Sequence, residues 1–149
     1  MSIRRDGILG PIQAQTAEPG LLNCDHKRPF WLSWRDRRVA LGTGGDVNTN
    51  QLLSWDAPNP LSIASLALDT AHEEMGVFDV FPLHSNTMTV HTPDTYLFDY
   101  LWMDSVDTYV TFQVQSCMNV KIALCEVKGE TDHDVHEVVL GADSQSNQK

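Results

Sequence analysis

The chain has 149 residues, 42% of them hydrophobic, and a formal net charge of −10. No apolar run approaches the roughly 20 residues of a membrane helix, and an acidic chain repels phosphate backbones, so we expect no membrane span and no nucleic-acid partner. The N-terminal segment lacks the apolar core of a signal peptide, which makes the cytoplasm the default location unless the chain is a piece of a larger extracellular protein.

Alternating apolar residues predict strands through most of the chain. The clearest alternation covers residues 30–35, 110–115 and 120–125, and shorter strands are predicted over 51–55, 62–69, 76–81, 96–101 and 136–142. Turn-forming residues separate these segments, and no segment has a convincing helical stripe. Eight to ten short strands with such spacing predict an all-β antiparallel sandwich, similar to a jelly roll.

The segment VALGTGGD, residues 39–46, resembles a cofactor-binding glycine loop. Such a loop needs a helix after it, whereas Asn, Thr and Pro follow here, and Val47 occupies the place of the third glycine. We therefore interpret these glycines as the end of a strand that requires a positive φ or a close approach to a neighbour.

The three cysteines do not suggest a disulfide framework. If residues 110–125 formed a hairpin turning at Met118 and Asn119, Cys117 and Cys125 would lie about 17 Å apart along the strands, beyond disulfide reach. Together with Cys24, they favour a chain of buried thiols compatible with the cytosol.

Two segments resemble a known domain family. RPFWLSWRDRRVALGTG, LLSWDAPNPLSIASLALDT and GVFDVF are similar to the C-terminal half of the farnesoic acid O-methyltransferase domain, and TYVTFQVQSCMNVKIALCEV and HEVVLGADSQSNQK resemble its N-terminal half. The halves stand in reversed order. We interpret residues 1–82 as the end of one domain, 83–95 as a linker and 96–149 as the start of a second, with a single circularly permuted domain over 1–149 as the alternative.

The resemblance implies two different functions. The family name implies methyl transfer from S-adenosylmethionine to farnesoic acid or a similar carboxylate, in the juvenile hormone pathway, but no donor-binding loop is recognisable. Similar domains in multi-domain proteins favour a non-catalytic recognition module without a cofactor, which binds a carbohydrate, a lipid or a protein. We prefer the recognition module, and exposed strand edges would also allow self-association.

Aromatic and basic residues supply the candidate binding site. Trp31 and Trp34 have opposite parity on one strand, so one of them faces away from the core and is either an exposed platform or covered by another layer. The predicted site consists of Trp31, Trp34, Arg35, Arg28 and Trp55, for a small apolar or sugar ligand or a protein partner. Arg28, Arg35, Arg37 and Arg38 form a basic cluster that suits an anion or a solvated hairpin face.

The sequence gives only weak indications of a metal site and none of a catalytic nucleophile. His133 and His136 lie in the acidic segment DHDVHE, but they need ligands from another element, and we favour an acidic loop that enters a strand. No serine or cysteine has the setting of a catalytic nucleophile.

Overall fold

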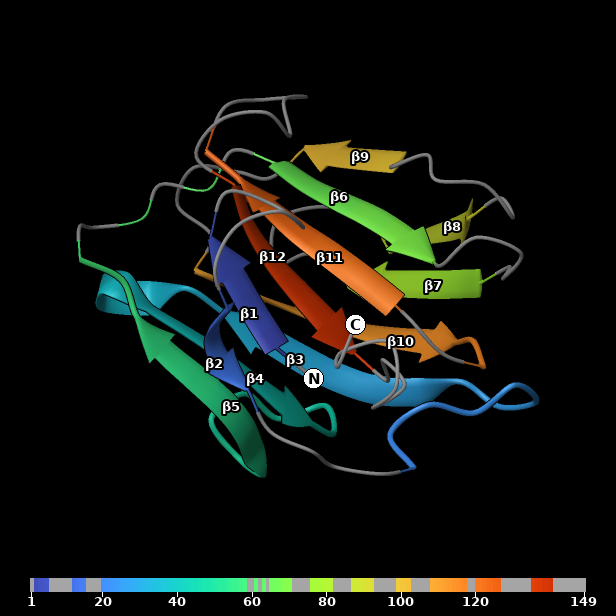
Figure 1. Cartoon of the computed structure of the whole chain (residues 1–149). Helices are drawn as coiled ribbons and strands as arrows, with labels where there is room; N and C mark the ends of the chain where they lie inside the picture. Colours follow the sequence, from blue (N-terminus) through green and yellow to red (C-terminus); the bar gives the residue numbers. More distant parts are fainter. Residues whose placement is uncertain are drawn as a thin grey trace.

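The computed structural model describes residues 2–5, 12–15, 20–58, 61, 63, 65–70, 76–81, 87–92, 99–102, 108–117, 120–126 and 135–140. In these residues the chain forms two six-stranded antiparallel sheets packed face to face, as Figure 1 shows. The predicted all-β antiparallel sandwich is confirmed.

The first sheet has the order β2-β1-β12-β11-β6-β9. Its strands are β1 (Ser2–Arg5), β2 (Ile12–Gln15), β6 (Ser65–Thr70), β9 (Asp99–Trp102), β11 (Val120–Cys125) and β12 (Val135–Leu140). The second sheet has the order β5-β4-β3-β10-β7-β8. Its strands are β3 (Arg28–Ser33), β4 (Arg38–Thr43), β5 (Gln51–Asp56), β7 (Gly76–Phe81), β8 (Met88–Thr92) and β10 (Tyr109–Gln115).

Period-two alternation places the core between the sheets. On β10, Val110, Phe112 and Val114 are buried while the residues between them are partly exposed. They pack with inward residues of both sheets, and Phe30 and Phe112 stack at 5.6 Å between ring centroids. This apolar core fixes which face of each strand points outward.

The two segments that resemble family halves build one sandwich together. β10 lies between β3 and β7, and β11 and β12 lie between β6 and β1. Residues 83–95, interpreted as a linker, contain β8, which pairs with β7 from Gly76↔Thr92 to Val80↔Met88. Strands from residues 109–140 therefore occupy central positions in both sheets.

The predicted hairpin of residues 110–125 is wrong. β10 and β11 belong to different sheets, so the chain crosses between the layers after Ser116. Alternation shows which residues of a strand face the core. It does not show whether two successive strands pair in one sheet or lie in opposite sheets across the core.

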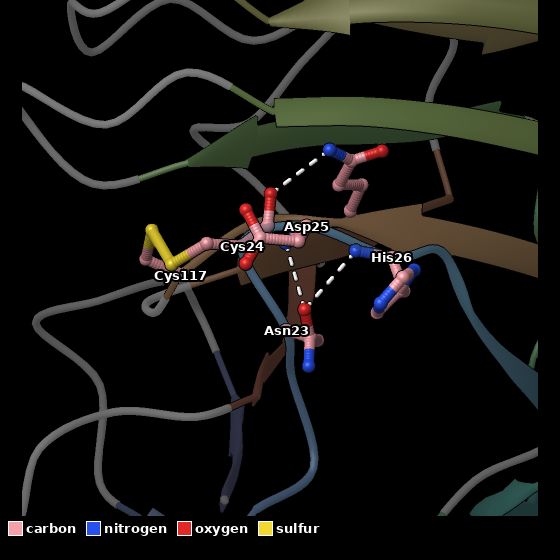
Figure 2. Close-up of a disulfide and its surroundings, with 6 residues drawn as sticks. Asn23, Cys24, Asp25, His26 and Cys117 are labelled. Carbon is pink, nitrogen blue, oxygen red and sulfur yellow. Dashed lines mark hydrogen bonds between the residues drawn. A yellow bond between two sulfur atoms is a disulfide. The ribbon is translucent and has the colours of Figure 1, made fainter.

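The expectation of three free thiols is also wrong. Cys24 and Cys117 form a disulfide with 4.3 Å between their Cα atoms, and only Cys125 is free among the cysteines. In Figure 2 the Asn23 side chain accepts hydrogen bonds from the backbone of Asp25 and His26 beside this disulfide. The Gln115 amide also donates to the Cys24 carbonyl at 2.9 Å. The disulfide ties the segment before β3 to the end of β10, a type of link that persists in oxidising environments.

Candidate outer-face pocket

Trp31 lies on the outer face of the second sheet but is 0% exposed. Its strand partner is Gly42, and a Cβ at Gly42 would overlap the indole ring. The indole Nε1 donates a hydrogen bond to the Thr49 carbonyl at 2.7 Å. Trp31 is the member of the Trp31 and Trp34 pair that faces away from the core, and of the two alternatives the exposed platform is wrong, because the chain's own 44–50 segment contacts the ring.

The other two candidate tryptophans belong to the core. Trp34 is 3% exposed and lies in the main apolar cluster between the sheets. Trp55 is partly buried against the same cluster, with its ring centroid 5.5 Å from that of His136. Trp34 is part of the core and Trp55, although partly exposed, packs against it, so neither ring forms a platform on the outer face.

A polar pocket of about 480 Å³ opens on the outer face formed by β3, β4 and β5. Ser33 and Ala40 are its two buried members and are direct partners across β3 and β4. Its described lining consists of Ser33, Arg35, Asp36, Arg37, Arg38, Ala40, Asn48, Gln51 and Asp56. Its volume falls within the range of about 300–1,000 Å³ that small-molecule sites occupy.

The turn 35–37 forms one border of this pocket. The backbone N–H of Trp34 donates to the Thr108 carbonyl at 2.9 Å, and that of Ala57 donates to the Arg37 carbonyl at 2.6 Å. Asp36 and Arg37 have φ values of 53° and 72°, in the left-handed region. Bonds at both ends thus hold the turn in a backbone conformation that L-residues adopt infrequently.

The 44–50 segment forms another border. Asn48 and Asn50 have φ values of 70° and 52°, and Gly44 has a φ of 89°. Thr49 Oγ1 donates to the Asp46 carbonyl at 2.6 Å, which closes the turn around Asn48. All four non-glycine residues with positive φ in the described part of the chain therefore lie in the two turns beside the pocket.

Charges in the lining are partly paired. Arg38 Nε donates to Asp56 Oδ1 at 2.9 Å. This hydrogen bond, together with the positive charges of Arg38 and Arg37, lowers the pKa of Asp56, and the same bond raises the pKa of Arg38. The lining holds three arginines and two aspartates, so it has an excess of positive charge in an acidic chain.

Of the five residues predicted to form the site, only Arg35 lines the pocket. Arg28 is exposed on β3, where it pairs with Val114, outside the lining. Sequence reasoning assigned Arg37 and Arg38 only to a basic cluster and missed Asn48 and Gln51. The sequence feature from which they could have been predicted is a basic turn followed by the Asn-rich segment 46–51. This segment brings polar side chains to the same face as the turn.

Only one of the two weak metal candidates lies in the part of the chain that the structure describes. His133 lies outside the described residues, and His136 is buried on β12, with its Nε2 4.0 Å from Glu126 Oε2. No group of three or more His, Cys, Asp or Glu side chains suited to a metal occurs among the residues that the structure describes.

The comparisons with known proteins give one family match. The model of the family described as farnesoic acid O-methyl transferase matches residues 1–81, more than half of the chain. The chain belongs to this family. No curated protein and no solved structure matches it. Family membership confirms the resemblance of the first segment, which contains the described lining of the outer-face pocket.

The farnesoic acid O-methyl transferase family name implies S-adenosylmethionine, but the pocket lining does not suit this methyl donor. The donor's sulfonium is positively charged, whereas the described lining holds three guanidinium groups against two carboxylates. The described lining also has no aromatic ring on which an adenine could stack. We therefore derive no methyl-transfer step from this pocket.

No helix in the described part of this family member has the length and apolar character needed to cross a membrane.

Proposed function

We propose that the chain is a non-catalytic recognition module of the farnesoic acid O-methyl transferase family that binds a carbohydrate in the outer-face pocket. The observation that carries this proposal is the polar pocket over β3, β4 and β5. Sugar hydroxyls both donate and accept hydrogen bonds, and Ser33, Asn48, Gln51 and Asp56 offer both functions around one cavity. A hydroxyl-rich ligand therefore matches the lining better than a lipid.

The pocket's backbone supports a binding role. Arg37 has a positive φ, which costs an arginine roughly 1 kcal/mol or more and persists where the surrounding structure holds it, often at ligand sites. Asp36, Asn48 and Asn50 also have positive φ, which Asp and Asn adopt more readily, and they lie in the two turns that border the pocket. The strain at Arg37 favours a preorganised site over a simple solvated hairpin face.

We propose that the functional unit is the whole sandwich. The turn 35–37 is anchored through Trp34 to Thr108, just before β10. β10 in turn pairs with β3 along its length, from Tyr109↔Ser33 to Val114↔Arg28. Both family-like segments thus support the pocket, although its described lining comes from residues 33–56 alone.

A glycan array with the whole chain tests the proposed function. Asn48→Gly and Gln51→Ala remove polar groups from the lining, and glycine suits the positive φ at position 48. Arg28→Gln is the control outside the pocket. We expect wild type and the control to bind the same glycans and both pocket variants to lose them. Equal binding by all four proteins would exclude the pocket.

Methyl transfer to a farnesoic-acid-like carboxylate is the alternative, and the family description is the observation that favours it. Calorimetric titration with S-adenosylmethionine separates the two functions. The recognition proposal predicts no binding heat at millimolar donor. Binding at or below millimolar concentration would support the enzyme instead.

A further inference from the structure

We propose that the ligand of the outer-face pocket carries an anionic oxygen group, a carboxylate or a sulfate on a sugar, which Arg37 and Arg35 bind. This inference rests on the proposed function and narrows its ligand class. It depends on how the three arginines of the lining are engaged, and on the backbone of the turn that presents two of them.

The three arginines are not equivalent. Arg38 forms a 2.9 Å ion pair with Asp56, so its guanidinium is already engaged by a carboxylate. Arg35 Nε lies 3.6 Å from Asp36 Oδ2, and both side chains are more than three-quarters exposed, so solvent weakens this pair. Among the described residues, Arg37 Nη1 donates to the Pro58 carbonyl at a long 3.5 Å, and the charge of Arg37 also acts on Asp56. Arg37 and Arg35 therefore retain donors for a ligand.

The backbone at Arg37 strengthens this assignment. Its φ of 72° favours glycine, and an arginine there is less stable in the folded state. Its carbonyl accepts the 2.6 Å hydrogen bond from Ala57, which fixes where the side chain leaves the main chain. A planar guanidinium held in this way suits two-point binding of carboxylate or sulfate oxygens.

The negative charge of the whole chain directs an anionic ligand to this pocket and away from the rest of the surface. The net charge of −10 disfavours an anion near most of the surface. The excess positive charge of the pocket lining provides a local exception. An acidic group on the ligand would therefore orient it with that group toward the turn 35–37 and its hydroxyls toward Asn48 and Gln51.

Calorimetric titration of the whole chain with glucuronic acid, glucose 6-sulfate and glucose tests the inference. We expect at least one acidic sugar to bind about tenfold or more tightly than glucose. Binding of only one acidic sugar identifies a carboxylate or a sulfate as the group, and equal binding of both shows recognition by charge. Arg37→Gly should abolish the preference without loss of stability, since glycine suits the backbone. Arg28→Gln removes the same charge outside the pocket and should retain the preference.

The outcomes distinguish this inference from the proposed function. Equal affinity for glucose and both acidic sugars, or an acidic preference that persists in Arg37→Gly, overturns the inference. Neutral glycans that depend on Asn48 and Gln51 would still support a carbohydrate-binding pocket. No binding of either acidic sugar overturns the inference, and an array on which no glycan depends on Asn48 and Gln51 for binding overturns the proposed function as well.

Discussion

The indole of Trp31 lies over Gly42, its partner on the neighbouring strand, with no room for a side chain at position 42. Gly42→Ala should therefore displace the indole and destabilise the fold by about 1–3 kcal/mol, as overpacking does in other buried sites. Urea unfolding monitored by tryptophan fluorescence measures the change.

Gly45→Ala is the matched control, because a Cβ at position 45 meets no atom within 4 Å. It should leave the urea midpoint unchanged or raise it slightly, because alanine restricts the unfolded chain more than glycine does. Equal midpoints for Gly42→Ala and wild type would show that the close contact with Trp31 does not restrict position 42 to glycine.

Trp31 acts on the pocket through the 44–50 segment. Its hydrogen bond to Thr49 holds the turn that contains Asn48. Trp31→Phe keeps a ring over Gly42 but removes the donor, so we expect a loss of about 1 kcal/mol in stability and up to about tenfold weaker glycan binding. Unchanged stability and affinity would contradict a positioning role. Affinity is measured by calorimetry with a glycan identified on the array.

The disulfide between Cys24 and Cys117 closes a loop across a sequence separation of 93 residues. Chain-entropy arguments assign about 4.6 kcal/mol to such a link. Addition of reductant should lower the melting temperature of wild type, and Cys24→Ser with Cys117→Ser should melt at the reduced value with or without reductant.

Cys125→Ala controls for the remaining thiol, which is buried and has its pKa raised by burial. This variant should still respond to reductant. A wild-type melting temperature that reductant leaves unchanged would contradict a stabilising disulfide.

Asp79 accepts two hydrogen bonds on the outer face of β7, from Lys27 Nζ at 2.6 Å and Thr89 Oγ1 at 2.8 Å. The bond from Lys27, and then that from Thr89, lower the pKa of Asp79. Asp79→Asn should reduce stability at pH 7 by about 1 kcal/mol, because a charge-assisted interaction is lost.

The acid side of the stability profile follows from this lowered pKa. The ionised form of Asp79 is favoured in the folded state, so its stabilisation is present above the ordinary aspartate pKa of about 4 and declines as pH falls toward the lower folded value. Urea unfolding between pH 2 and 7 should show a shallower acid decline for Asp79→Asn than for wild type. Parallel curves would contradict the assignment.

Most strands were predictable because the core requires alternation. The segment 76–81 matches β7 in full, and residues 30–35 and 51–55 contain most of β3 and β5. The three strands that were not predicted are β1, β2 and β8. The short strand β8 alternates Thr89 and His91 with only partly buried Met88 and Val90. Weak burial at a sheet edge leaves a weak pattern in the sequence.

The candidate site was harder to predict, because it depends on which element covers each outward face. Parity placed one of Trp31 and Trp34 outside the core, but only the fold shows that it is Trp31 and that the 44–50 segment lies against it. The close approach at Gly42 and the positive φ at Gly44 confirm the interpretation of residues 39–46 as a strand end. The Cys24 link escaped prediction because it joins residues far apart in sequence.

The central claim, that an acidic sugar binds in the outer-face pocket, is tested most directly by NMR of the arginine side chains. During titration of the whole chain with glucuronic acid or glucose 6-sulfate, whichever binds more tightly, the Nε–H signals of Arg35 and Arg37 should shift, and that of Arg28, outside the lining, should remain in place. No shift at Arg35 and Arg37, with or without a shift at Arg28, would contradict the claim.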